Sequence, residues 1–227
     1  MIGAPKHVKK AIDAGVDIIC AQGGEGGGHT GEIPTSILIP KVCDLVREIG
    51  ATSPLTGAPI HVMAAGGIFD GRGLAMALAL GASGVWVGTR FVAAKEAGAP
   101  PRHQKAVVEA DYDSTVRTII FTGRPMRVRK NDMIMNWEEN RQHDIRELTG
   151  KGILPMAKQA EEDEGKELSF QEQMDRLPLL MGQAAGAIDS VLPAKEIMEE
   201  MVATAISTLR GTTEMFVTVG AEAQARL

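Results

Sequence analysis

Residues 16–31 read VDIICAQGGEGGGHTG, a short apolar run that leads directly into a segment with six glycines. Because Val16–Ala21 is apolar and rich in β-branched residues, it predicts a buried strand. The same arrangement, an apolar run followed by glycine, recurs at residues 60–67 (IHVMAAGG) and 85–89 (VWVGT). Strand, loop, helix and strand at a spacing of roughly 30 residues predict βαβ units and a parallel sheet.

Helical patterns separate these strands, and each ends at a glycine. In Pro40–Ile49, apolar side chains recur on one helical face and Gly50 follows, which is typical of a helix C-terminus. By the same criteria we expect helices at Lys6–Ala14 and Gly73–Leu80. Beyond these units the pattern predicts a helix at Pro100–Ala110, a strand at Ser114–Phe121, a long helix that starts at Pro193 and stops at Gly211, and a frayed tail at 221–227.

The composition of the 227 residues excludes several classes of protein. Two cysteines cannot form a disulfide scaffold or a multi-cysteine metal site, and they fit a reducing compartment. A net charge of −5 and only eight aromatic residues (five Phe, two Trp, one Tyr) count against a nucleic-acid surface. No apolar run approaches the roughly 18 residues of a membrane helix, and the N-terminus lacks a signal-peptide core. We therefore expect no nucleic acid, no membrane and a cytoplasmic location.

The first glycine-rich loop, residues 22–31, is the strongest candidate for chemistry. Its glycines allow the backbone to pass close to a flat ligand and to point N–H groups at it. His29 is the one side chain in the loop of a type that ordinarily titrates near neutrality, which suits a general base. The alternative is a flexible loop with a surface histidine, but the two further strand ends with glycines favour a functional role.

The second and third loops have the features of a phosphate site. Gly66-Gly67 leads into a helix, whose free N–H groups favour an anion. Gly88-Thr89 offers backbone N–H groups and a hydroxyl, and Arg90 adds a candidate guanidinium. Paired loops of this kind resemble the phosphate site of the last two strands in (β/α)₈ barrels. The alternative is that these glycines only make tight turns.

Other groups have plainer interpretations. The basic run of Arg124, Arg127, Arg129 and Lys130 is interpreted as a solvated face, because the chain is acidic and no aromatic residue lies among them. His61 lies inside an apolar strand and is expected to be an interior histidine. Cys20 is expected to pack in a strand and not to act as a nucleophile.

Three segments together resemble a known family. QGGEGGGHTG (22–31), HVMAAGGIFDGRGLAMALALGASGVWVGTRF (61–91) and MGQAAGAI (181–188) look like nitronate monooxygenases, formerly called 2-nitropropane dioxygenases, with the match closest to fungal members. The flavin-containing enoyl-acyl-carrier-protein reductases are close relatives. The resemblance implies an FMN-dependent TIM barrel that oxidises an alkyl nitronate with O₂ to a carbonyl compound and nitrite.

The resemblance also implies roles for particular residues. His29 would be the catalytic base that removes the α-proton of a neutral nitroalkane. Gln22 and Gly27 would contact the flavin, and Gln183 would approach it. The FMN phosphate would be held by Gly66, Gly67, Trp86, Val87, Gly88 and Thr89.

Only three clear βα strands precede the C-terminal region, and they match the family's sixth to eighth strands. We therefore expect an α/β TIM (β/α)₈ barrel of the FMN-binding type, truncated to its C-terminal half, plus a helical C-terminal region. The expected division is a barrel portion at 1–121, an insertion or lid-like segment at 122–167 and C-terminal helices at 168–220. Two alternatives stay open: an enoyl reductase of the same fold and an inactive truncated remnant. A homo-oligomer is also left open.

Overall fold

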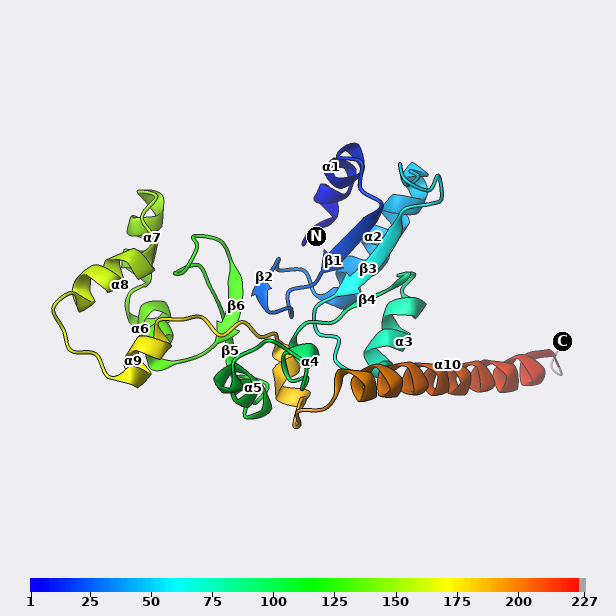
Figure 1. Cartoon of the computed structure of the whole chain (residues 1–227). Helices are drawn as coiled ribbons and strands as arrows, with labels where there is room; N and C mark the ends of the chain where they lie inside the picture. Colours follow the sequence, from blue (N-terminus) through cyan, green and yellow to red (C-terminus); the bar gives the residue numbers. More distant parts are fainter. Residues whose placement is uncertain (225–227) are drawn as a thin grey trace.

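The computed structural model describes residues 1–224, with side chains as far as Met215. Its centre is a parallel sheet of β1 (Ile18–Gln22), β3 (His61–Ala65) and β4 (Gly84–Trp86) in the order β1-β3-β4 (Figure 1). Ile2 extends the parallel arrangement beyond β1, where it forms a bridge with Ala21. The predicted βαβ units and parallel sheet are confirmed.

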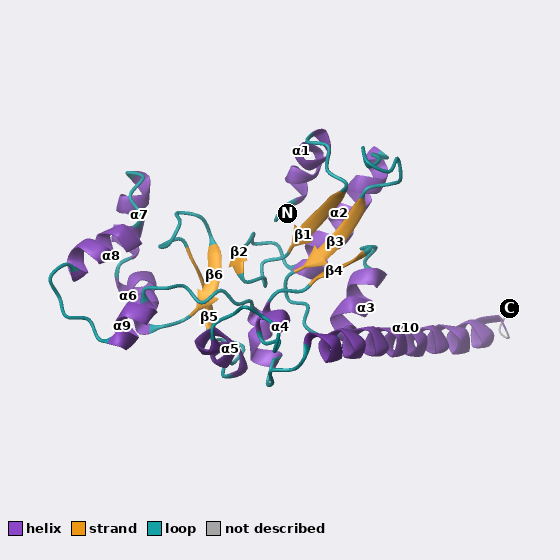
Figure 2. Ribbon diagram, in the orientation of Figure 1, coloured by secondary structure: helices purple, strands orange, loops and turns teal. Residues whose placement is uncertain are grey.

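The sheet is covered on one face by helices (Figure 2). Alternate residues such as Ile19 and Ala21 of β1, with Val62 and Ala64 of β3, are buried in the same apolar core as α2 (Thr35–Ile49). His61, expected inside the strand, is exposed instead, because β3 begins at this residue and its ring reaches Ser83 (Nδ1 to Oγ, 3.1 Å). The interpretation of His61 as an interior histidine is wrong.

The predicted helices are present with shifted ends. The first contains η1 (Pro5–His7) and α1 (Val8–Asp13), and the third is α3 (Gly71–Ala79), whose N-terminus is capped by the Asp70 side chain. Helix α2 begins five residues earlier than the predicted Pro40 and ends before Gly50, which has a φ of 65°. Pro40 therefore lies inside α2 and not at its start, and it lacks the backbone N–H of a helical hydrogen bond there.

A second, antiparallel sheet was not predicted. It has the order β2-β6-β5, where β2 is Gly28–His29, β5 is Thr115–Thr118 and β6 is Met126–Arg129. Its apolar core includes the fully buried Trp137 and is formed with α6 (Asp132–Asn140), α7 (Gln142–Gly150) and α8 (Pro155–Asp163). Because β2 belongs to the first glycine-rich loop, the two sheets meet at that loop.

The remaining helices are α4 (Thr89–Val92), α5 (Pro101–Val108), α9 (Phe170–Asp175), η2 (Gln183–Ala187) and α10 (Ala194–Gln224). Of these, α4, α5 and η2 contribute to a third apolar cluster, and the last is a long C-terminal helix. Helix α10 packs on α3 with its first turns and then projects from the rest of the molecule (Figure 1).

The predicted stop of the last helix at Gly211 is wrong. Gly211 lies in open space inside α10, where a glycine weakens a helix by only ~1 kcal/mol and does not end it. Of the predicted tail, 221–224 belong to α10 and 225–227 lie outside the described residues. No helix within residues 1–224 is both long and apolar enough to cross a lipid bilayer.

Candidate functional site

A cavity of about 330 Å³ lies where β1, β3 and β4 end. It is lined by Met1, Gln22, Gly26, Gly27, His29, Ala65, Gly66, Gly67, Ile68, Trp86, Gly88, Thr89, Gly182 and Ala184. Eight of the ten residues that the resemblance assigned to the site are in this lining. Val87 is not, and it packs against the core of the parallel sheet. Gln183 is exposed and does not line the cavity, although its two neighbours do.

Gln22 shapes the first loop from the end of β1. Its side chain is 8% exposed, and its Nε2 donates to the carbonyl oxygen of His29 at 3.1 Å and of Gly27 at 3.4 Å. A Cβ on Gly26 would lie 2.4 Å from the same nitrogen, so only glycine fits there without a shift. The buried amide therefore fixes the path of the backbone that carries His29.

The first loop is also fastened to residues 181–184. A Cβ on Gly27 would stand 2.6 Å from the carbonyl carbon of Met181, and one on Gly182 would stand 2.5 Å from the carbonyl oxygen of Glu25. The amide of Gly182 donates to Oγ1 of Thr89 at 2.9 Å. The two backbones are thus in contact, and the Thr89 hydroxyl acts as an acceptor in the wall of the cavity.

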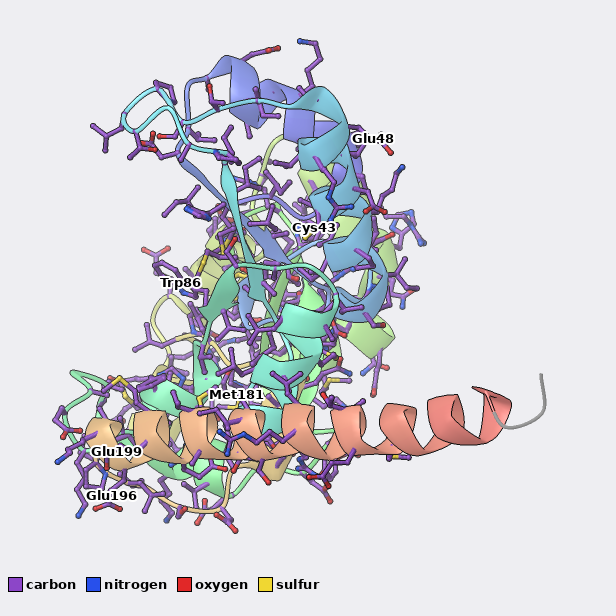
Figure 3. The ribbon with its side chains drawn as sticks, turned by 90° about the vertical axis from the view of Figure 1, so that its right-hand side faces the viewer. Cys43, Glu48, Trp86, Met181, Glu196 and Glu199 are labelled. Carbon is purple, nitrogen blue, oxygen red and sulfur yellow. The ribbon has the colours of Figure 1, made fainter. Side chains whose placement is uncertain are left out.

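Backbone donors at the ends of β3 and β4 are free. Within residues 1–224, the amides of Gly66, Gly67 and Gly88 have no hydrogen-bond acceptor. Gly66 and Gly67 have φ angles of 91° and 73°, which disfavour any side chain. Trp86 is 60% exposed and lies on the opposite side of the sheet from Cys43 of α2 (Figure 3). The arrangement supplies N–H groups to an anion and an aromatic face beside them.

Glu25 is a site-neighbouring residue that the sequence reasoning missed. Its carboxylate accepts from the amide of Thr35 at 3.0 and 3.1 Å, at the first residue of α2. The Thr35 hydroxyl lies 3.0 Å from Glu25 Oε2 and 2.8 Å from the Gly66 carbonyl oxygen. The negative charge is therefore engaged by the start of α2. The sequence feature that could have indicated this role is an acidic residue inside a glycine-rich loop, ten positions before the start of a helix.

His29 stands between the first cavity and a second one. The second cavity has a volume of about 590 Å³, and its polar lining includes Lys6, His7, Glu32 and Arg124. Met1, Gln22 and His29 line both cavities. The His29 ring is exposed, and its Nε2 lies 2.9 Å from Oγ1 of Thr122. A ligand in either cavity would therefore have access to the imidazole.

The basic run from Arg124 to Lys130 is a solvated face only in part. Arg124 is exposed, but the interpretation is wrong for Arg127 and Arg129. Arg127 donates from Nε and Nη2 to the carbonyl oxygen of Gly24 at 3.2 and 3.0 Å, and Arg129 donates to that of Ala106. Burial lowers the pKa of Arg127, as does the nearby Arg117. Arg127 and Arg129 lie on the face of β6 opposite the buried Met126 and Val128 and are half-buried there. The sequence did not reveal this because β2, which pairs with β6, is distant in the chain.

Two other candidates lie away from the chemistry. Arg90 is 7% exposed, donates to the carbonyl oxygen of Ser190 at 2.9 Å and does not line the cavity, so its expected contribution to a phosphate site is wrong. Burial raises the pKa of the Cys20 thiol, which fits packing in β1 and not nucleophilic attack. Among the described residues, no group of three or more His, Cys, Asp or Glu side chains could hold a metal.

Comparison with known proteins agrees with this geometry. The family model described as "Nitronate monooxygenase" matches residues 1–204. The chain belongs to the nitronate monooxygenase family. This is a family of flavin-dependent oxidoreductases, as the three motifs implied. The relatives and structures compared below are bacterial, so the expected closeness to fungal members stays a prediction.

Three similar proteins illustrate the range of chemistry. A (3aS,4S,5R,7aS)-5-hydroxy-7a-methyl-1-oxo-octahydro-1H-indene-4-carboxyl-CoA dehydrogenase of Mycobacterium tuberculosis is 32% identical, over 92% of this chain and 65% of its own length. The structure of FabK from Thermotoga maritima matches with a TM-score of 0.69 and 29% identity, over 94% of this chain and 62% of that one. The structure of nitroalkane oxidase from Streptomyces ansochromogenes matches with a TM-score of 0.67 and 27% identity. The match covers 93% of this chain and 58% of that one. The chain thus spans about three fifths of the length of these relatives.

Proposed function

We propose that this chain carries the FMN-binding loops and the catalytic histidine of an enzyme that oxidises alkyl nitronates with O₂ to a carbonyl compound and nitrite. The observation that supports the proposal is the single cavity that gathers His29, the glycine loop and the free amides of Gly66, Gly67 and Gly88. Its partners would be a small nitronate or nitroalkane and O₂.

The residues present fit FMN. Three amides without acceptors suit a phosphate, because unpaired backbone donors at strand ends form ready anion sites. Gly27 and Gly88 present bare backbone to a flat ring, and Trp86 adds an exposed aromatic surface. When bound, FMN would supply the electron-transfer chemistry of the reaction. Val87 would support the backbone of Gly88 by packing against the apolar core of the parallel sheet.

The chain's own side chains would orient the substrate and handle its proton. His29 would take the α-proton from a neutral nitroalkane, and Gln22 would hold the backbone that positions His29. A nitronate is already deprotonated, so its oxidation would not need this base. The 590 Å³ cavity on the other side of His29 would admit the substrate.

We further propose that β1, β3 and β4 are the sixth to eighth strands of a TIM (β/α)₈ barrel. The supporting observation is that Ile2 pairs in parallel beside β1, as the end of a preceding strand would. Residues 1–121 would form the barrel portion, 122–167 the lid-like insertion and 168–220 the C-terminal helices. Because β1, β3 and β4 would form only part of the barrel wall around the flavin, we expect FMN to be lost during purification and to bind when it is added in excess.

An enoyl reductase that uses NAD(P)H is the second candidate, because FabK has the same fold at 29% identity. Two assays with added FMN separate the candidates: nitrite release from a nitronate under air, and NAD(P)H oxidation with an enoyl thioester. Nitrite formation that depends on O₂ supports the proposed function. Steady NAD(P)H consumption without nitrite would favour the reductase. If neither activity is detected, the alternative of an inactive remnant is favoured.

A further inference from the structure

Thr122 lies in the turn between β5 and β6, and its hydroxyl is the hydrogen-bond partner of the His29 ring. Oγ1 of Thr122 stands 2.9 Å from Nε2 of His29, although 93 positions separate the two residues. The same oxygen lies 3.2 Å from the carbonyl oxygen of Arg124 and 3.3 Å from its amide nitrogen. One hydroxyl hydrogen and two lone pairs must therefore serve three neighbours.

Only one assignment satisfies all three contacts. The carbonyl oxygen of Arg124 can only accept, so the Thr122 hydroxyl donates its hydrogen there. The amide of Arg124 can only donate, so it occupies one lone pair of Oγ1. The second lone pair must accept a hydrogen from the third neighbour. We infer that Thr122 is a positioning residue that holds neutral His29 as the Nε2–H tautomer and leaves the basic lone pair on Nδ1.

The backbone around Thr122 holds this contact in place. His29 pairs with Met126 in the β2–β6 ladder, and the amide of Thr30 donates to the carbonyl oxygen of Pro125 at 3.2 Å. The turn itself is closed by a bond from the Gly123 amide to the Ile119 carbonyl oxygen at 2.8 Å. Within the described part of the chain, Nδ1 of His29 makes no hydrogen bond, so this nitrogen is available to a ligand.

The assignment, which rests on the proposed role of His29, specifies how the base would work. Nδ1 forms a bond to the α-proton of the nitroalkane as the C–H bond breaks, and the electron pair moves into the nitro group to give the nitronate. The imidazolium that results keeps its Nε2–H bond to Thr122, and that bond becomes stronger because the donor is now charged. Removal of the hydroxyl therefore disfavours the protonated ring.

Other charged groups face His29, and they set the background for any pH dependence. Lys6 and His7 from η1, Glu32 from the segment before α2, Arg124 from the β5–β6 turn and the α-amino group of Met1 line the adjoining cavities. Glu32 is paired with Arg117. None of these groups changes in a Thr122 variant, so a comparison among variants isolates the hydroxyl.

The direct test is ¹⁵N NMR of the histidine-labelled chain, with the His29 signals assigned by their loss in His29→Ala. The variants are Thr122→Val, Thr122→Ser and the control Thr149→Val, whose hydroxyl bonds to the Ile145 carbonyl oxygen on α7. We expect the Nε2–H tautomer in the native chain, Thr122→Ser and the control, and a mixture in Thr122→Val. Protonation at Nδ1 in the native chain, or an unchanged spectrum in Thr122→Val, would overturn the inference.

A kinetic readout with added FMN distinguishes positioning from a structural role. In Thr122→Val, kcat/KM for a neutral nitroalkane should fall roughly 2- to 10-fold, which corresponds to the loss of one hydrogen bond. The acidic limb of the pH profile of kcat/KM should move to lower pH, because the protonated ring is disfavoured. Thr122→Ser should restore both, and nitronate turnover should stay unchanged throughout. An equal loss at every pH and on both substrates would contradict the inference. If no variant releases nitrite, the proposed function fails while the NMR result still decides the tautomer.

Discussion

The two sheets of this molecule are built from the chain in opposite ways. The parallel sheet uses strands that follow one another between residues 18 and 86, each joined to the next through a helix. The antiparallel sheet joins Gly28–His29 to two strands between residues 115 and 129 (Figure 2). Local patterns therefore describe the first sheet well, whereas the second depends on a pairing between distant segments.

The difference matters for chemistry because the two sheets contribute different groups to the site. The parallel sheet supplies backbone: glycine loops and free amides at the ends of β1, β3 and β4. The antiparallel sheet supplies side chains that touch those loops, namely Thr122 on His29 and Arg127 on Gly24. Variants that damage one contribution and spare the other test this division of roles.

The largest effect is expected from His29→Ala. Loss of a general base should reduce turnover of a neutral nitroalkane by about 10²- to 10⁴-fold, while turnover of the preformed nitronate should persist. Parallel steady-state assays on the two substrates, with added FMN, measure this difference. His61→Ala is the matched control, because His61 is exposed at the start of β3 and lies outside the site. Unchanged activity of His29→Ala on the neutral substrate would remove the base role.

Trp137→Ala should disrupt the antiparallel sheet and its helices. Trp137 is fully buried, stacks under the Arg141 guanidinium at 3.6 Å and donates to Gln159. Its truncation should cost about 3–5 kcal/mol, as for other buried aromatic residues. Hydrogen exchange should then show lost protection in β5, β6 and α6, with β1 and β3 still protected. Equal loss in both sheets would mean that the two sheets fold as one unit.

Arg127→Met should loosen the contact between the two sheets. The methionine keeps apolar bulk but removes the charged donors to the carbonyl oxygen of Gly24, a loss of about 1.5–3 kcal/mol. Denaturant unfolding and the affinity for added FMN should both decrease. Arg124→Met provides the control, because Arg124 is exposed on the adjacent turn. An effect of equal size in both variants would refute a specific role for Arg127.

The smallest effect is expected at the far end of the antiparallel region. Asp163 accepts from Arg176 at 2.8 Å, and this bond lowers the pKa of the Asp163 carboxyl. Because the pKa of Asp163 is lower in the folded state, ionisation of this carboxyl stabilises the folded protein above the unfolded pKa of about 4. That stabilisation is lost as the pH falls through the lower, folded-state pKa. Asp163→Asn should therefore reduce stability at pH 7 by less than ~1 kcal/mol and have no effect near pH 2. A loss that persists at pH 2 would point to packing instead.

The sequence predicted the parallel half of the site for a physical reason. Apolar runs and helix-ending glycines are local features, so β1, β3, β4 and the cavity lining at Gly66 and Gly88 could be read directly. Thr122 and Arg127 could not be found in this way. Their roles arise only when Gly28 pairs with Arg127, and nothing in the local pattern of either segment specifies its partner.

Helix ends were the other source of error, and they too depend on tertiary contacts. Gly211 resembles Gly50 in the sequence, yet Gly50 has a left-handed conformation at the end of α2 and Gly211 continues α10. The buried guanidinium of Arg90 and the half-buried one of Arg127 could not be predicted either, because charged residues are ordinarily exposed.

The most direct test of the central claim is fluorescence titration of FMN against Gly27→Ala and Gly150→Ala. A Cβ on Gly27 would strike the Met181 backbone inside the cavity wall, whereas one on Gly150, at the end of α7, would meet nothing within 4 Å. The account predicts saturable quenching by the native chain and by Gly150→Ala, and at least tenfold weaker binding by Gly27→Ala, which is the loss of about 1.4 kcal/mol. Equal binding by both variants, or no saturable binding by the native chain, would contradict it.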